Sequence, residues 1–175
     1  MLIIREKCLM KMAIYGAGSL GTILGSLLTK SGYDIDLIDV NEVHVKALNE
    51  KGAKIIGLMD LTQPVTALTP EQMTEKYDLM FYLTKSTHDQ SSLPYVIKYL
   101  QPDGMLVTGQ NGMPEQNIND IVGKERVIGQ ITGWGATWVK PGVSKLTSPP
   151  NHMTFEIGEQ DGRITERLKM IAEIL

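Results

Sequence analysis

The chain of 175 residues is long enough to bury a sizeable core and has the size of a single domain. Its 42% hydrophobic and 21% charged residues are typical of soluble globular proteins, and a net charge of −3 without a basic cluster argues against nucleic acid as a partner. A single cysteine excludes an intrachain disulfide and a cysteine-based metal site, and the sequence has neither a membrane-spanning stretch nor a signal-peptide layout, which predicts a cytoplasmic protein.

Residues 1–10 precede the first predicted element and are interpreted as an N-terminal extension of a domain that covers residues 11–175. The short apolar run 12–15 predicts a buried strand. Six residues in the pattern G-x-G-x-x-G follow it: Gly16, Ala17, Gly18, Ser19, Leu20 and Gly21. A helix is predicted over 19–31, with apolar residues at helical spacing that are expected to face the sheet: Leu20, Ile23, Leu24, Leu27 and Leu28.

Strand, glycines and helix in this order are typical of a dinucleotide-binding turn. Gly16 permits the tight turn, Gly18 lets a pyrophosphate approach the backbone, and Gly21 lets the helix pack closely on the strand. The free N–H groups and the positive end of the helix dipole would then face the phosphates. An ordinary glycine-rich turn is the alternative, and the acidic residue that follows favours the dinucleotide interpretation.

A second apolar run, 35–38, ends in Asp39, at the place where dinucleotide-binding domains carry an acid. This carboxylate can accept both ribose hydroxyls of the adenosine and would repel the extra phosphate of NADP, so it favours NADH over NADPH. Alternatively Asp39 caps the next helix, predicted over 41–51, and both roles are compatible. His44 is expected on the solvated face of that helix, without a chemical role. The three histidines show no metal-ligand spacing, so no metal site is predicted.

The rest of the chain alternates between strands and helices, which predicts an α/β fold with a Rossmann-type, doubly wound, mainly parallel sheet. The predicted pieces are strands at 53–57, near 64–67, 77–83, 104–108 and 126–129, and helices at 70–76 and 87–100, the latter with Pro94 as a kink.

The amino-acid composition changes after Gly133, where glycine, tryptophan, threonine and proline dominate. Strand-like pieces at 143–146 and 153–157 predict a small antiparallel extension at the sheet edge, and 161–175 predicts an amphipathic helix. The sequence ends within this helix without a cap signal, so a longer natural protein is expected.

Polar residues follow two of the predicted strands, at the carboxyl ends where open α/β sheets bind their ligands. Thr84 and Lys85 follow strand 77–83, and Asn111 follows strand 104–108. The lysine could contact the cofactor or a substrate carboxylate, and the asparagine amide could donate to a nicotinamide or substrate oxygen. A solvated lysine and a simple Asn-Gly turn are the alternatives, but the position of both strands beside the nucleotide cleft favours a binding role.

The motifs together resemble the ketopantoate reductase family. They are GAGSLG, then Thr84-Lys85-Ser86, Gln110-Asn111-Gly112-Met113, Trp134-Gly135-Ala136 and Pro141-Gly142, in order and with similar spacing. The resemblance implies an N-terminal Rossmann domain and a helical C-terminal domain that is absent from this chain. It also implies NADPH- or NADH-dependent reduction of a 2-oxo acid, ketopantoate to D-pantoate, in pantothenate and coenzyme A biosynthesis.

By the same resemblance residues 16–21 hold the pyrophosphate, Lys85 and Asn111 orient cofactor and substrate, and Ala136 gives a backbone contact to the cofactor. The family's general-acid lysine comes from the helical domain, so this chain alone is expected to bind cofactor and to be nearly inactive. Asp39 departs from family members that use NADPH and looks more like the NADH-dependent D-2-hydroxyacid dehydrogenases. A non-catalytic nicotinamide-binding module is a third candidate, and a homodimer is compatible with all three.

Overall fold

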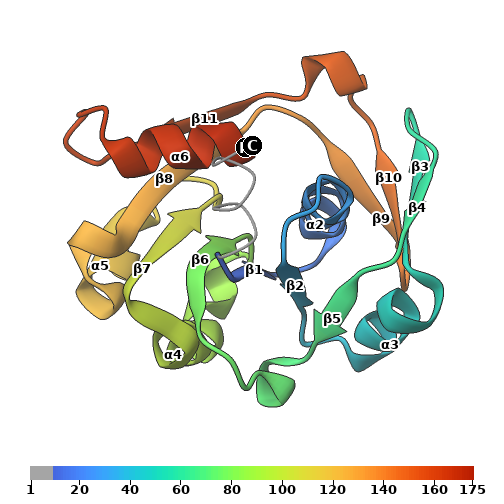
Figure 1. Cartoon of the computed structure of the whole chain (residues 1–175), viewed down its shortest axis with the longest axis horizontal. Helices are drawn as coiled ribbons and strands as arrows, with labels where there is room; N and C mark the ends of the chain where they lie inside the picture. Colours follow the sequence, from blue (N-terminus) through green and yellow to red (C-terminus); the bar gives the residue numbers. More distant parts are fainter. Residues whose placement is uncertain (1–9) are drawn as a thin grey trace.

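Residues 10–175 are described by a computed structural model, in which a seven-stranded and a four-stranded sheet lie on either side of helix α2 (Ser19–Lys30) (Figure 1). The predicted N-terminal extension falls almost entirely on residues 1–9, outside the described residues, so it stays a prediction.

The main sheet is doubly wound about strand β1 (Met12–Tyr15), as predicted. Its order is β11 (Phe155–Gly158), β8 (Val127–Thr132), β7 (Leu100–Thr108), β6 (Tyr77–Tyr82), β1 (Met12–Tyr15), β2 (Ile35–Ile38) and β5 (Thr66–Leu68). All neighbouring strands are parallel except β11, which pairs antiparallel with β8 at the edge. Since β2 and β6 flank β1 on opposite sides, the strand order reverses at β1, where such sheets bind ligands.

Helices cover both faces of the main sheet (Figure 1). Helices α4 (Asp89–Tyr99) and α5 (Glu115–Val122) pack on one face in a cluster with Met80 and Leu106. On the other face α2 and α6 (Glu166–Ile174) share a cluster with β1, and α3 (Glu42–Lys51) packs beside β2 and β5. Within residues 10–175, four short 3-10 helices lie in the connections, at Pro70–Gln72, Ser86–His88, Lys124–Arg126 and Pro150–His152.

Helix α2 is buried against two different hydrophobic clusters. Leu24 and Leu28 pack in the cluster with β1, whereas Leu20, Ile23 and Leu27 pack in a cluster with the smaller sheet. The expectation that all five face one sheet is therefore wrong for three of them. A helix that is apolar on more than one face belongs in the interior, which explains the composition of this segment.

The smaller sheet has the order β4 (Leu61–Gln63), β3 (Ala53–Gly57), β10 (Val143–Leu146) and β9 (Ala136–Lys140). Strands β3 and β10 are parallel and the other two pairs are antiparallel. The bounds predicted for β3 and β10 are confirmed, but β10 does not extend the edge of the main sheet as expected. Of the two predicted edge pieces, only β11 lies there. Helix α5 and strands β4 and β9 had no predicted counterpart.

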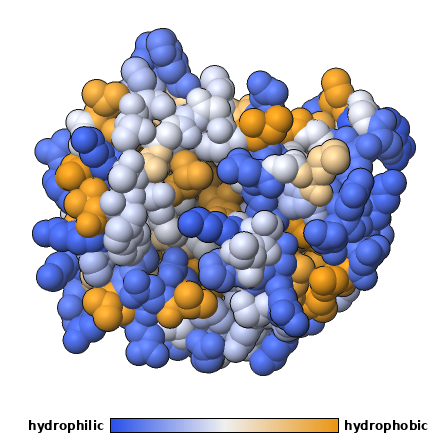
Figure 2. Space-filling model, turned by 180° about the vertical axis from the view of Figure 1, so that it is seen from behind, coloured by the Kyte–Doolittle hydropathy of each residue, from blue (hydrophilic) through white to orange (hydrophobic). Residues whose placement is uncertain are grey.

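The outer surface is mixed in character. Figure 2 shows that hydrophilic residues cover much of the face opposite to that in Figure 1, with hydrophobic residues in separate groups. No helix among residues 10–175 is long and apolar enough to cross a membrane.

Candidate functional site

Four of the predicted site segments meet at the carboxyl edge of the main sheet, because they follow neighbouring parallel strands. The glycine-rich turn follows β1, Asp39 follows β2, Lys85 follows β6 and Asn111 follows β7. Backbone bonds continue the pairing into these loops: the N–H of Leu83 donates to Tyr15 O at 2.8 Å, and that of Gly109 to Tyr82 O at 3.0 Å.

The glycine-rich turn is held tightly against its surroundings. Gly16 has a φ of +101°, and a Cβ there would lie 2.8 Å from the backbone nitrogen of Thr84. The N–H groups of Gly16 and Ala17 both donate to Ile38 O at 2.9 Å. A Cβ on Gly21 would lie 2.3 Å from Gly16 O. These contacts are the close turn and the close helix packing for which glycines at these positions were predicted.

Gly18 has the opposite surroundings. It is the N-cap residue of α2, and no side chain of the described residues caps this helix start. A Cβ at Gly18 would meet no atom within 4 Å. The free N–H groups of the first helical turn therefore open onto space at the ligand edge of the sheet. These residues fit the pyrophosphate of a dinucleotide.

Asp39 lies half-buried at the end of β2, next to this turn. Its Oδ1 accepts the N–H of Asn41 at 2.9 Å, and Asn41 is the N-cap of α3, where it accepts the N–H of His44 at 3.1 Å. Asp39 thus supports the cap without being the cap residue itself. The other carboxylate oxygen of Asp39 has no hydrogen-bond partner among the described residues, so it is available to a ribose.

Lys85 and Asn111 are both exposed at the ends of neighbouring strands. Within residues 10–175 Lys85 forms no ion pair with a carboxylate. An unpaired ammonium group beside an exposed amide is suited to an anionic ligand.

Gln110 joins the two strand-end loops, a role that sequence reasoning missed. It is buried, and its Nε2 donates to Asp89 Oδ1 at 2.7 Å and to Thr84 Oγ1 at 3.4 Å. The Tyr82 hydroxyl donates to the same Asp89 oxygen at 2.8 Å, and burial raises the pKa of Tyr82, which keeps it a neutral donor. The signal available in the sequence was the position of Gln110, directly before Asn111.

Ala136 lies in the smaller sheet, unlike the other predicted site residues. It opens β9 in the smaller sheet and packs, partly buried, in the cluster that contains Leu20. It comes four residues after the end of β8 in the main sheet, but it is already part of a strand of the smaller sheet. Its backbone contact to a cofactor stays a prediction.

His44 is fully buried, so its expected place on a solvated helix face is wrong. Its Nδ1 accepts the N–H of Gly142 at 2.9 Å, and its Nε2 lies 2.8 Å from Ala17 O and 3.2 Å from Thr22 Oγ1. Trp138 contacts the ring edge-on, with 4.6 Å between centroids. The β9–β10 turn covers this side of α3 and removes His44 from solvent.

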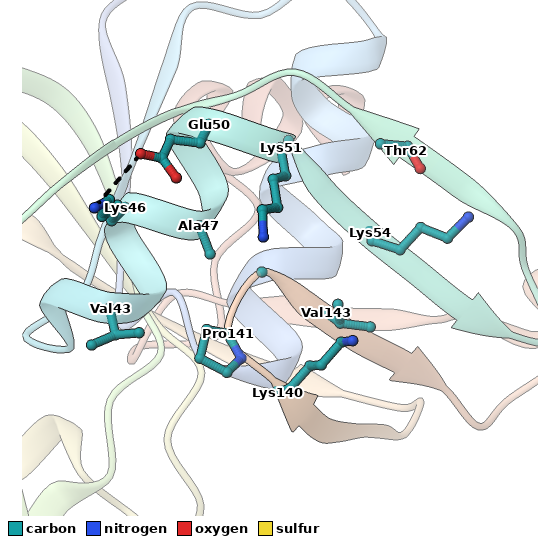
Figure 3. Close-up of a pocket in the computed structure, with 12 residues that line it drawn as sticks. Val43, Lys46, Ala47, Glu50, Lys51, Lys54, Thr62, Lys140, Pro141 and Val143 are labelled. Carbon is teal, nitrogen blue, oxygen red and sulfur yellow. Dashed lines mark ion pairs between the residues drawn. The ribbon is translucent and has the colours of Figure 1, made fainter.

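A hollow of about 580 Å³ lies behind this turn, between α3 and the smaller sheet (Figure 3). Figure 3 shows Lys51 extending from α3 toward Pro141, and Lys46 pairs with Glu50 at 3.8 Å. The hollow contains none of the predicted site residues. No group of three or more His, Cys, Asp or Glu side chains in residues 10–175 is arranged to hold a metal ion.

The sequence model of the ketopantoate reductase family (PanE/ApbA) matches residues 12–161, which include the glycine-rich turn and all the strand-end motifs. The chain belongs to the ketopantoate reductase family. A 2-dehydropantoate 2-reductase from Pyrococcus abyssi is 40% identical over 141 residues, which are 79% of this chain and 45% of the relative. One from Pyrococcus horikoshii is 36% identical and covers 77% of this chain and 43% of the relative.

Solved structures show the same fold. A 2-dehydropantoate 2-reductase from Geobacter metallireducens superposes with a TM-score of 0.82 and 27% identity, over 94% of this chain and 54% of that one. A D-mandelate dehydrogenase, solved with NADH and anilino(oxo)acetate, superposes with a TM-score of 0.81 and 24% identity, over 94% and 53%. The chain therefore has an NAD(P)-binding fold and spans about half the length of the proteins it matches.

Proposed function

We propose that this chain binds NADH or NADPH at the carboxyl edge of its main sheet, as the cofactor-binding part of a cytoplasmic reductase. The substrate of the whole protein would be a small 2-oxo acid, ketopantoate, reduced to D-pantoate for pantothenate and coenzyme A biosynthesis. The observation that carries this proposal is the open, uncapped start of α2 at Gly18, with Asp39 at the end of the adjacent strand.

A bound nicotinamide would supply the hydride for the substrate carbonyl. The described residues would bind and orient. Lys85 offers an ammonium group to the carboxylate of a 2-oxo acid, and Asn111 offers amide N–H groups to the substrate or the nicotinamide. Gln110 fixes the loop of Thr84 relative to Asn111 through its bonds to Thr84 and Asp89. The proton donor is expected from the helical domain of the whole protein.

An NADH-dependent D-2-hydroxyacid dehydrogenase is the second candidate. Asp39 favours it, because a carboxylate at the ribose repels a 2′-phosphate. The fold is also that of a D-mandelate dehydrogenase whose structure contains NADH. A non-catalytic nicotinamide-binding module is a third candidate, but it would not need both Lys85 and Asn111.

The proposal is tested by titrating the protein with NADH and NADPH and following binding by fluorescence or calorimetry. We expect NADH to bind more tightly. The Asp39→Asn variant removes the charge but keeps a side chain that can accept the N–H of Asn41. It should lower the preference for NADH by about tenfold or more, mainly through tighter NADPH binding.

Asp103→Asn is the matched control, since Asp103 is exposed in the first half of β7, away from the carboxyl edge. It should change neither dissociation constant. Failure of the wild-type protein to bind either nucleotide would refute the proposal. Assays of the whole protein with ketopantoate and with mandelate-type 2-oxo acids then separate the first two candidates, and no turnover of any 2-oxo acid would favour the third.

A further inference from the structure

His44 joins three segments that are far apart in the sequence. It lies on α3, bonds Ala17 in the glycine-rich turn, and accepts a bond from Gly142 in the β9–β10 turn, 98 residues further on. The side chain is completely buried. A buried polar ring with both nitrogens bonded fixes the groups that it touches.

The bond from Gly142 determines which ring nitrogen of His44 carries the proton. A backbone N–H can only donate, so Nδ1 must be the unprotonated acceptor, and the neutral ring then carries its proton on Nε2. Nε2 can therefore donate to Ala17 O at 2.8 Å. Thr22 Oγ1 donates to the same carbonyl at 2.7 Å, so Ala17 O is held by two side chains.

Holding this carbonyl also orients the next N–H group. In a planar trans peptide the C=O of Ala17 and the N–H of Gly18 point in opposite directions. Ala17 O points inward to His44 and Thr22, so the N–H of Gly18 points outward. Gly18 is the residue that borders open space at the start of α2.

We propose that His44 is a positioning residue for the cofactor: its neutral imidazole fixes the Ala17–Gly18 peptide so that the Gly18 N–H faces the pyrophosphate. The inference rests on the proposed dinucleotide binding. The β9–β10 turn holds the ring in this position, because the N–H of Gly142 donates to Nδ1 of His44.

Protonation would break this arrangement, because a cationic ring has no acceptor for the N–H of Gly142. Burial lowers the pKa of His44 below its ordinary value of 6.5, although the bond to Ala17 and the charge of Asp39 oppose this effect. Asp39 is the charged group that acts on the ring, while Thr22 from α2 and Trp138 from β9 are uncharged. The neutral form therefore predominates near neutral pH.

The test compares two substitutions that each keep one of the two hydrogen bonds between His44 and the backbone. His44→Gln retains a side-chain N–H that reaches toward Ala17 O, and His44→Asn retains an acceptor near Gly142. His152→Gln is the control, because His152 is exposed. Dissociation constants for NADH and NADPH are measured in a series from about pH 8 down into the acid range in which the protein stays folded, and the unfolding temperature of each variant is measured alongside.

We expect His44→Asn to weaken cofactor binding about tenfold at about pH 8, and His44→Gln to weaken it less. Wild-type affinity should fall as the pH is lowered through the depressed pKa of His44, and both variants should lose that fall. The fluorescence of Trp138, in contact with the ring, reports the protonation of His44 without cofactor.

If His44 has a merely structural role, its variants should have a lower unfolding temperature, but the folded variants should keep the dissociation constants of the wild type and their pH dependence. That result would overturn this inference and leave the proposed function intact. Absence of nucleotide binding in the wild-type protein would instead overturn the proposed function and, with it, this inference.

Discussion

Gly18 and Gly21 have different roles in the glycine-rich turn. A Cβ at Gly18 meets only open space, whereas a Cβ at Gly21 would lie 2.3 Å from a backbone oxygen. We expect Gly18→Ala to change the free energy of unfolding by less than about 0.5 kcal/mol and to weaken cofactor binding, because the methyl group occupies the space for the pyrophosphate. Gly21→Ala should destabilise by about 2 kcal/mol or more.

Thermal unfolding and NADH titration of both variants check this contrast. A stable Gly18→Ala protein with wild-type affinity would show that the ligand does not approach the turn here. A Gly21→Ala protein as stable as the wild type would refute the close packing of α2.

His44 shows why some site residues escape sequence reasoning. Val45 and Leu48 mark the buried stripe of α3, and His44 lies on the same stripe one turn before Leu48, but a single polar residue there does not by itself predict burial. What buries His44 is the β9–β10 turn, and no local pattern predicts that this distant turn folds over α3. Gly18 and Gly21, by contrast, were assigned from the glycine spacing together with the strand, the helix and the acidic residue around it, because all of these features lie within one βαβ unit.

At the scale of elements, a polar cluster joins β6 to β2 within the core. Tyr77 is fully buried and its hydroxyl donates to Asp36 Oδ2 at 2.8 Å, while Lys11 Nζ lies 3.2 Å from the same oxygen. Burial raises the pKa of Tyr77, so it remains a neutral donor. We expect Tyr77→Phe to destabilise the protein by about 1–2 kcal/mol, because a buried carboxylate loses a hydrogen bond.

Urea unfolding measures this loss. Tyr95→Phe is the control, since the Tyr95 hydroxyl bonds Glu71 on the exposed surface, and it should have no measurable effect. Equal losses in the two variants would contradict a specific role for the buried bond.

The elements themselves were predicted to different degrees. Strand β3 was found with its observed bounds because two β-branched residues, Ile55 and Ile56, lie between the glycines at 52 and 57. Its pairing with β10 is a long-range contact that local pattern does not encode. Helix α5 was missed because only Ile118 and Val122 of its eight residues are buried. Strand β9 has no buried residue, so it lacks the alternation by which strands are recognised.

At the scale of the whole molecule, one ion pair holds the last helix on the sheet. Glu159, which follows β11, accepts from Arg167 Nη2 of α6 at 2.6 Å, and its side chain is 7% exposed. Arg167 also bonds the carbonyl of Glu125, and Leu168 beside it enters the core. Arg167 thus connects α6 with the end of the edge strand and with the 3-10 helix Lys124–Arg126 before β8.

The hydrogen bond from Arg167 holds the pKa of Glu159 below its usual 4.5. The stabilisation is therefore complete above about pH 4.5 and is lost as the pH falls through the lower folded-state pKa. We expect Glu159→Gln to cost about 2 kcal/mol at neutral pH and progressively less toward about pH 3.

Unfolding curves at several pH values test this expectation, with Asp161→Asn as control, since Asp161 pairs with Arg163 at the exposed surface. The control should show no resolvable loss. A Glu159→Gln effect that does not shrink in acid would contradict the assignment.

The burial of α2 between two sheets has a consequence for how a ligand is received. The helix cannot tilt or slide unless both clusters repack, one through Leu24 and the other through Ile23. Its first turn is consequently pre-organised, so the N–H groups at Gly18 need little ordering when an anion arrives. The entropic cost of binding then falls mainly on the mobile partner, the dinucleotide, and on the exposed side chains of Lys85 and Asn111.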